Sequence, residues 1–408
     1  MKRNLILLMA LLVFPSAIYA GGYRVSLQGV RQAALGAQGA VLSHDASVAF
    51  YNPAALAFVD SKFSIAAGGF GVSLTGKYQN RLTGETAETD NPLGTPIYAA
   101  VSYKPTEKLA LGVSFTTPFG STVDWGNEWA GKYVINRIEL KSYFLQPTVS
   151  YRFNDWFGVG VGYILASGSV NIQREVAVGN SDASLELNSK DGKGTGFNIG
   201  AYIKPHETVT VGIAYRSKVE MEVEGGDVMW QNVPGLVSSS MPFAATQFDA
   251  ALPLPYEAIF GLSWQATPKL MLLGEVGSVG WEEYRELDIA FTGGNTPYNS
   301  VSTQKYDHTY NYSFGAEYAA TDMFDLRLGY KYDSTPSPAE YFNPQTPTTD
   351  YHSFTLGLGT HFGGFNLDLM GQYTMGEERT FKNVESGFGG DLRLNGFIFG
   401  AGVSYNLQ

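Results

Sequence analysis

The sequence predicts an all-β protein: a 14-stranded antiparallel transmembrane β-barrel with an N-terminal hatch plug in the lumen. Apolar residues alternate with polar or small ones along most of the chain after residue 61, as in strands that face two environments. Short turns alternate with long polar loops between these strands, a pattern typical of outer-membrane barrels. No segment in this part of the chain holds the ~20 consecutive apolar residues of a membrane helix.

Residues 1–20 are expected to be a signal peptide for secretion. Lys2 and Arg3 precede an apolar run over 5–14, and Ala20 supplies a small residue at the cleavage point. Loss of Lys2 and Arg3 from the 27 basic residues leaves 25 against 38 acidic ones, so the mature formal charge is −13. This acidity argues against a nucleic-acid partner. Without cysteine, the chain has no disulfide and no thiolate metal site.

Residues 21–60 are expected to form the hatch plug, ahead of a barrel over 61–408. Asn52 followed by Pro53 and Ala54 predicts a short helical turn, because asparagine caps free N–H groups and proline has no N–H to leave unpaired. In a closed barrel this turn is the candidate gate, formed by Asn52, Pro53 and Ala54. An ordinary N-terminal cap on a soluble β-protein explains the same residues equally well.

The strands of the barrel follow with a regular rhythm, clearest over 109–116, 157–165, 208–218, 324–333 and 397–405. Near Gly68 and Gly69 the apolar parity changes, which predicts a β-bulge. Tight turns are expected at 104–107, 153–156, 204–207, 265–268, 320–322 and 363–364, and long loops at 79–96, 120–135, 176–194, 225–250, 292–303, 334–350 and 377–391. These connections separate fourteen strands, and an even number closes the sheet without an edge.

Basic residues fall on the polar side of these strands. Arg216, Lys218, Arg327 and Lys331 all occupy such positions. A basic side chain facing lipid at mid-bilayer would cost roughly 2–4 kcal/mol. We therefore expect these four residues in the lumen or at the ends of strands.

The strand over 157–175 also places apolar residues on the lumen side. Val170 and Ile172 share the parity of Arg174. An apolar pocket with one cation suits a ligand that has an apolar chain and a carboxylate head. A solvated charge at the base of a loop is the alternative for Arg174.

The strand over 109–117 ends at Pro118. Because proline cannot donate to the ladder, Pro118, Phe119 and Gly120 are candidates for a lateral gap in the wall, and a plain strand end is the alternative.

Two long loops carry aromatic and apolar residues. Trp230, Leu236 and Phe243 are candidates for a capture surface, with packing against the barrel mouth as the alternative. In the loop over 120–135, Trp125 and Trp129, together with Tyr133, are expected at the membrane interface.

The sequence contains no enzyme motif, neither Gly-x-Ser-x-Gly nor His-Glu-x-x-His, and no cofactor or metal is expected. The five histidines are scattered, at His44, His206, His308, His352 and His361. A hydrolase would have to assemble a serine, a histidine and an acid from separate loops. A second rival is a non-transporting barrel that serves as an adaptor in protein export. An apolar lumen pocket would favour transport, and a filled lumen would favour the adaptor.

Several motifs resemble the FadL-type (FadL/TodX-like) outer-membrane transporters of long-chain fatty acids and other hydrophobic compounds. The matching segments are Gly21-Gly22-Tyr23, Asp45-Ala46-Ser47, Tyr51-Asn52-Pro53-Ala54, Leu252-Pro253-Leu254-Pro255 and Tyr215-Arg216-Ser217-Lys218. The resemblance implies a monomer in the outer membrane of a Gram-negative cell, in contact with lipid and lipopolysaccharide. It implies passive uptake of a hydrophobic small molecule without a cofactor.

The resemblance also implies a route. External loops capture the molecule, a lumen pocket holds it, and a hatch movement frees it through a lateral gap at the third strand. Arg174 matches a basic pocket residue of the fatty-acid members. Their second basic position falls on Asp307, with Lys305 two residues before it as a substitute. Because of this departure, aromatic hydrocarbons stand beside fatty acids as alternative substrates.

Overall fold

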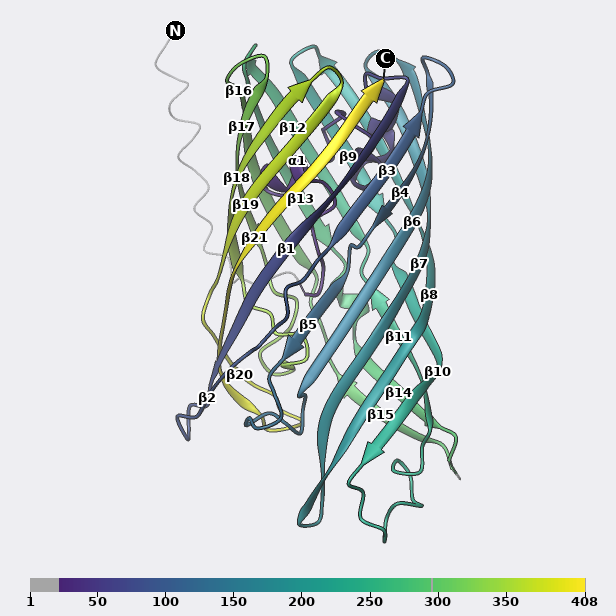
Figure 1. Cartoon of the computed structure of the whole chain (residues 1–408), viewed down its shortest axis with the longest axis vertical. Coiled ribbons are helices and arrows are strands. Elements are labelled where there is room, and N and C mark those ends of the chain that lie inside the picture. The colour runs from purple at the N-terminus through teal and green to yellow at the C-terminus, as the bar shows by residue number, and fades with distance from the viewer. Residues whose placement is uncertain (1–21, 295, 408) are drawn as a thin grey trace.

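The computed structural model describes residues 22–294 and 296–407, so the predicted signal peptide lies outside the described residues. Over these ranges the chain forms one antiparallel barrel around a small helical unit (Figure 1). In this part of the chain, fourteen strands close the ring: β1 (Phe63–Gln79), β3 (Ile97–Tyr103), β4 (Leu109–Thr116), β6 (Arg137–Asn154), β7 (Phe157–Val178), β8 (Ser181–His206), β9 (Val209–Arg216), β12 (Glu257–Thr267), β13 (Leu270–Val279), β16 (Thr309–Ala319), β17 (Phe324–Asp333), β18 (Tyr351–Phe362), β19 (Phe365–Gly376) and β21 (Gly389–Leu407). Each pairs with the next and β21 pairs with β1, which confirms the predicted barrel.

Further strands extend the wall at the end that carries the long loops, at the bottom of Figure 1. Among the described residues they are β2 (Thr86–Glu88), β5 (Gly120–Asp124), β10 (Val219–Gln231), β11 (Gln247–Leu254), β14 (Glu286–Thr292), β15 (Tyr298–Thr303) and β20 (Arg379–Lys382). The predicted loop over 176–194 was wrong, because these residues extend the β7–β8 hairpin. Its inward residues Ala183, Leu185 and Leu187 are buried, so the segment is polar only on its outer face.

The predicted bulge at Gly68 and Gly69 was also wrong. The register of β1 against β21 runs without a shift from Phe63↔Leu407 to Gln79↔Asp391, and its register against β3 is unbroken up to Gly69↔Ile97. The parity change has a different cause. Beyond Gly69 the larger apolar side chains of β1, such as Phe70, point into the lumen, and small residues point outward.

The basic residues lie where their parity predicted. Arg216, Arg327 and Lys331 are buried in the lumen, each within reach of a carboxylate. Lys218 lies in the break between β9 and β10, where its Nζ pairs with Glu283 at 3.0 Å. None of these four charges therefore faces the apolar middle of the bilayer.

The helical unit comprises α1 (Val30–Ala34), α2 (Val48–Tyr51) and the 3₁₀ turn η1 (Pro53–Phe58), and it lies inside the short-turn end of the barrel (Figure 1). Another 3₁₀ turn, η2 (Trp281–Glu283), follows β13. Among the described residues, no helix is long and apolar enough to cross a membrane.

Glycines on the lumen face form a seat for this plug. A Cβ at Gly160 would lie 2.4 Å from the carbonyl carbon of Pro53, and one at Gly212 would lie 2.0 Å from the carbonyl oxygen of Ala40. A Cβ at Gly200 would lie 2.1 Å from Oδ1 of Asn52. The plug backbone can rest directly on the wall because these positions carry no side chain.

Candidate functional site

The turn that begins at Asn52 joins the plug to the wall. Oδ1 of Asn52 accepts the N–H of Ala54 at 3.0 Å, and Pro53 occupies the first position of η1, which confirms the predicted cap. The amide of the same side chain donates to the carbonyls of Ala40 at 2.8 Å and of Ala201, on β8, at 3.0 Å. Asn52 is fully buried. One side chain therefore caps η1, ties two parts of the plug together and anchors both to the barrel.

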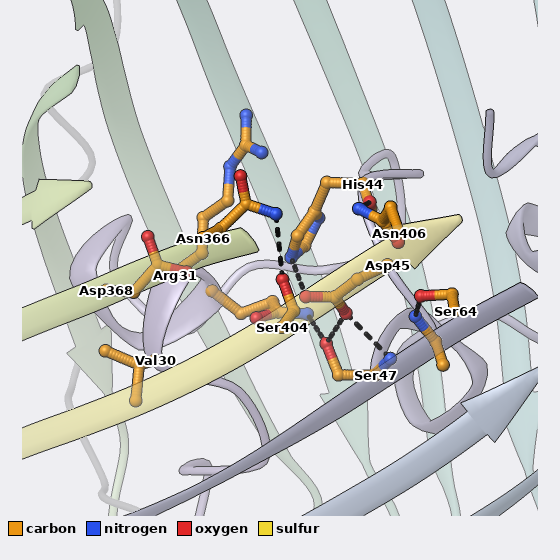
Figure 2. A network of polar contacts seen from close by, with 12 residues as sticks. Val30, Arg31, His44, Asp45, Ser47, Ser64, Asn366, Asp368, Ser404 and Asn406 are labelled. Carbon is orange, nitrogen blue, oxygen red and sulfur yellow. Dashed lines mark hydrogen bonds and ion pairs between the residues drawn. The ribbon is translucent and has the colours of Figure 1, made fainter. Parts of the chain in front are cut away.

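A polar network joins the plug to β1, β19 and β21 (Figure 2). Oδ1 of Asp45 accepts the N–H of Ser47 at 2.8 Å and its hydroxyl at 2.5 Å. Ser64, on β1, accepts the N–H of Ala46 at 3.0 Å. His44 lies beside Asp45 with 3.5 Å between Nε2 and Oδ2, and burial lowers the pKa of His44 to about 4. The histidine is thus held neutral in the seated plug.

Buried ion pairs add to this attachment. Arg24 contacts Glu257 on β12 and pairs with Asp333 on β17 at 2.9 Å. Arg31, on α1, pairs with Glu317, which Arg327 also contacts at 2.6 Å. Removing one partner of such a pair leaves an uncompensated buried charge and costs about 3–5 kcal/mol.

The pairing along the wall is interrupted next to the lateral-gap candidates Pro118, Phe119 and Gly120. β4 ends at Thr116 and β5 begins at Gly120, and the register against β6 shifts from Thr116↔Phe144 to Gly120↔Lys141. Three residues of the broken strand therefore lie opposite two residues of β6, as in a bulge. Phe119 is buried and turned inward, with its N–H on Oγ of Ser142 at 3.0 Å.

The N-terminal segment occupies the edge of this break. The N–H of Val25 donates to the carbonyl of Pro118 at 2.8 Å, and the N–H of Gly120 donates to the carbonyl of Tyr23 at 3.0 Å. The side-chain amide of Gln28 takes the place of a neighbouring strand as the hydrogen-bond partner of the Thr117 backbone. It donates to the Thr117 carbonyl at 3.1 Å and accepts the Thr117 N–H at 3.1 Å. Residues 23–28 therefore satisfy backbone groups that the wall leaves unpaired.

An apolar cavity lies next to this segment, on its side towards the long-loop end of the barrel. The space between its lining residues amounts to about 870 Å³, part of it open to solvent. Tyr23 and Tyr284 line it together with Gln345 and Thr346 of the loop over 334–350. Its apolar lining includes Ile138, Leu140, Val170, Ile172, Met221, Phe248, Leu252 and Ile289.

Val170 and Ile172 line the cavity, whereas the two candidate cations do not. Arg174 is half-buried on the lumen face of β7, two positions beyond Ile172, and makes no hydrogen bond or ion pair with a described residue. Lys305 is exposed, with a left-handed φ of 46°, and its Nζ donates to the hydroxyl of Tyr341 at 2.7 Å. The substitute cation suggested by the sequence is thus not part of the cavity lining.

The sequence did not identify Met221, Phe248, Leu252 or Tyr284 as cavity residues. Met221 follows the parity of a recognisable strand, which could have placed it in the lumen. Phe248, Leu252 and Tyr284 lie in segments that were predicted to be loops or that were not assigned from the sequence. Only the pairing of β10, β11 and β14 brings them to one cavity.

The loop over 232–246 folds back on the barrel in part. Trp230 and Phe243 pack edge to face with their ring centroids 4.9 Å apart, and Leu236 is 97% exposed at the tip. Of the three capture-surface candidates, one is therefore free at the surface and two are engaged with each other.

The expectation that Trp125 and Trp129 lie at the membrane interface was wrong. Both are buried at the mouth of the barrel, stacked with ring centroids 4.5 Å apart. Trp125 Nε1 donates to the carbonyl of Pro344 at 3.1 Å. They point inward because the mouth is filled by the loop over 334–350, whose Phe342 belongs to the same core. Tyr133 is 47% exposed.

One histidine joins a serine and an acid. Nε2 of His308 lies 2.8 Å from Oγ of Ser278, and Nδ1 lies 3.0 Å from Oε2 of Glu282. The N–H of Gly280 beside them is taken by the carbonyl of Tyr256 at 2.9 Å rather than left for an oxyanion. We interpret the cluster as a polar contact that fixes η2 to β13 and β16, since a hydrolase needs such a donor.

Comparisons with known proteins agree with this architecture. The model of a family described as outer membrane protein transport protein (OMPP1/FadL/TodX) matches residues 11–407. The long-chain fatty acid transport protein of Salmonella typhi is 22% identical over 298 residues, 64% of either chain, so the match spans just under two thirds of that relative.

Two solved structures have similar folds. A FadL homologue of Pseudomonas aeruginosa aligns with a TM-score of 0.82 at 20% identity, over 95% of this chain and 100% of that one. The toluene transporter TodX of Pseudomonas putida aligns with a TM-score of 0.72 at 16% identity, over 96% and 99%. At these identities the similarity shows the fold.

Proposed function

Because this chain belongs to the OMPP1/FadL/TodX family of outer membrane transport proteins, we propose that it carries hydrophobic molecules inward across the outer membrane, with long-chain fatty acids as its first substrates. The family consists of channels, as the lack of enzyme motifs led us to expect. The observation that supports transport by this chain is the apolar cavity in the lumen. A lumen filled throughout would instead have favoured the adaptor in protein export.

The substrate follows a route that the geometry makes reasonable. An acyl chain lies in the cavity between Ile172 and Leu252, and its carboxylate faces Arg174, an unpaired cation further towards the mouth. A charge-assisted pair of this kind is worth about twice a neutral hydrogen bond. The cavity itself is closed towards the plug by Tyr23.

The gate is the N-terminal segment over 22–28 rather than the whole plug. The plug from residue 29 onward rests on glycines and on polar contacts with many strands, whereas the segment is the part that covers the broken strand. When Tyr23 and Val25 leave Pro118 and Gly120, an opening forms beside β5 and the substrate passes sideways into the membrane.

Neutral aromatic hydrocarbons are the second candidate substrates. The observation that favours them is the position of Lys305, which is exposed and bound to Tyr341. Of the two cations that the family resemblance suggested, only Arg174 then remains as a candidate. It lies outside the cavity lining. A neutral ligand the size of toluene would need neither Arg174 nor Lys305, because it has no charged head group.

The experiment that tests the proposal measures uptake and binding for two matched ligands. Purified protein is titrated with a long-chain fatty acid and with the alkane of equal length, for wild type and Arg174→Ala. We expect weaker binding of the acid alone, by about 5- to 30-fold, the equivalent of about 1–2 kcal/mol. Equal loss for both ligands would reject the head-group role. Failure of the wild type to bind either ligand or to support uptake in cells would reject transport.

A further inference from the structure

The middle of β1 carries only small side chains on its outer face. Beyond Ala67, the residues that point outward are Gly69, Gly71, Ser73 and Thr75. The register is unbroken through this stretch, so the change in pattern that the sequence shows is a change of side chains and not of backbone. The transport route, which runs inside the lumen, gives no reason for it.

A shallow groove occupies this thin part of the wall. It crosses three neighbouring strands and is lined by Ser73 and Thr75 on β1, Tyr373 on β19, and Asn395 and Phe397 on β21. The rings of Tyr373 and Phe397 lie 4.9 Å apart and form its apolar end. Oδ1 of Asn395 is buried and has no hydrogen-bond partner among the described residues, so a hydroxyl donor there would satisfy it.

The groove lies at the outer edge of the apolar band. Outward residues of β21 are apolar from Leu407 to Phe397, and the next outward residues are Asn395 and Arg393. Ten residues of a strand rise roughly 33 Å along its axis, or roughly 25 Å in height at a tilt of about 40°. This height equals the roughly 25 Å band of an outer-membrane barrel. The apolar end of the groove therefore lies at acyl-chain depth and the polar end at head-group depth.

Two cations face each other immediately beyond the groove. Lys77 on β1 and Arg393 on β21 are direct cross-strand partners, and both are exposed. Like charges in this arrangement repel, with Cβ atoms about 4.5–5.5 Å apart. Lys77 pairs with Glu88 at 3.1 Å, whereas Arg393 makes no ion pair or hydrogen bond with a described residue.

Two of the three cations around this site have carboxylate partners. Lys77 pairs with Glu88 and Arg81 pairs with Asp391 at 3.0 Å, whereas the Arg393 side chain has no ion pair among the described residues. The mature chain as a whole is expected to be strongly acidic. A cation without an ion pair, opposite Lys77 on such a surface, is a site where an anionic partner can bind.

We propose that the groove and its cation pair bind one molecule of the phosphorylated glycolipid that forms the outer leaflet of the outer membrane. An acyl chain of lipid A lies over Tyr373 and Phe397, where β1 presents only small side chains. A phosphate lies between Lys77 and Arg393, accepting hydrogen bonds from both and removing their repulsion. The inference rests on the position of the barrel in the outer membrane and does not depend on which substrate crosses the lumen.

The test uses the mature full-length barrel in detergent and two probes, bisphosphorylated lipid A and its dephosphorylated form. Native mass spectrometry counts the molecules retained by wild type, by the double variant Lys77→Gln/Arg393→Gln, and by Lys382→Gln as a matched control. Lys382 is an exposed lysine of β20 outside the groove lining. We expect wild type and control to retain one molecule of bisphosphorylated lipid A, with binding at least tenfold weaker in the double variant. The dephosphorylated probe should bind weakly to all three.

A second variant tests the acyl end without changing charge. Ser73→Phe fills the groove and should lower retention of bisphosphorylated lipid A by a similar factor. Its fold is checked by the shift in electrophoretic mobility on heating. Equal retention by wild type and the double variant would overturn the proposal. Equal loss in the Lys382→Gln control would overturn it as well, because binding would then follow overall charge rather than this site.

Discussion

The sharpest prediction concerns Gln28, the side chain that completes the broken strand. In Gln28→Ala, the N–H and carbonyl of Thr117 and the carbonyl of Val25 lose their partner. Gln28 is fully buried. Each unsatisfied buried group costs about 1–3 kcal/mol, but water that enters the break will satisfy part of this set. A net loss of about 2–3 kcal/mol for the closed state is therefore a reasonable expectation.

A loss of this size shifts the balance between the closed and the open segment about 30- to 150-fold towards the open state. The assay exploits the lack of cysteine in the chain. A single cysteine introduced as Val25→Cys is labelled with a maleimide that is soluble in water, in the presence and absence of Gln28→Ala. Labelling should be at least tenfold faster in the double variant, and cells that carry Gln28→Ala should show altered uptake of labelled fatty acid.

Gln32→Ala is the matched control. Gln32 is also a buried glutamine of the N-terminal region, but its amide donates to the hydroxyl of Ser47 inside the plug, at 2.8 Å, and not to the wall. We expect labelling at the wild-type rate for this control. If Gln28→Ala is labelled no faster than Gln32→Ala, and uptake is unchanged, residues 22–28 do not form the gate.

Three further predictions follow from the plug and the wall. Asn52→Ala removes a cap worth about 0.5–2 kcal/mol and two further hydrogen bonds, so hydrogen exchange in η1 should quicken and uptake change. Normal exchange would contradict the anchoring of η1 by this side chain, and unchanged uptake with normal expression would count against a role of this side chain in gating. Burial holds the pKa of His44 near 4 in the seated plug, so protonation between pH 6.5 and 4 favours the unseated state by up to about 3 kcal/mol. Stability should fall over that window in wild type but much less in His44→Gln, as followed by thermal unfolding at each pH; parallel curves would refute the assignment. A fluorophosphonate probe should leave Ser278 unlabelled, because its contact with His308 is structural; labelling that Ser278→Ala abolishes would show that this interpretation is wrong.

Most strands of the barrel could be predicted from the alternation of apolar and polar residues along the sequence. The strand over 324–333 could be predicted because Leu326 and Leu328 alternate with Asp325 and Arg327, and the same pattern placed Arg327 in the lumen. Apolar–polar alternation was missed where the outward face of a strand is polar instead of apolar. Leu185 and Leu187 lie in a segment whose outer face is polar, so the whole segment was taken for a loop.

The candidate site could be predicted only in part, because its members are joined by long-range pairing. Val170 and Ile172 followed from the parity of one strand, but Phe248 and Leu252 reach the same cavity through the pairing of β10 with β11. Trp125 was misplaced for a related reason. A tryptophan in a loop prefers the membrane interface only if nothing fills the barrel mouth, and the loop over 334–350 fills it.

The glycine seat constrains how the plug can move. Gly160, Gly200 and Gly212 allow close contacts with the plug that any displacement of the plug must break. Arg31 adds a buried ion pair to Glu317, whose loss costs about 3–5 kcal/mol, more than the change we expect at Gln28. For residues 22–28 to open alone, the Arg24 side chain has to keep Glu257 and Asp333 while its backbone leaves Phe119, which a long side chain permits. A short segment hinged on Arg24 therefore opens at lower cost than the whole plug, so gating should depend more on residues 22–28 than on the helices behind them.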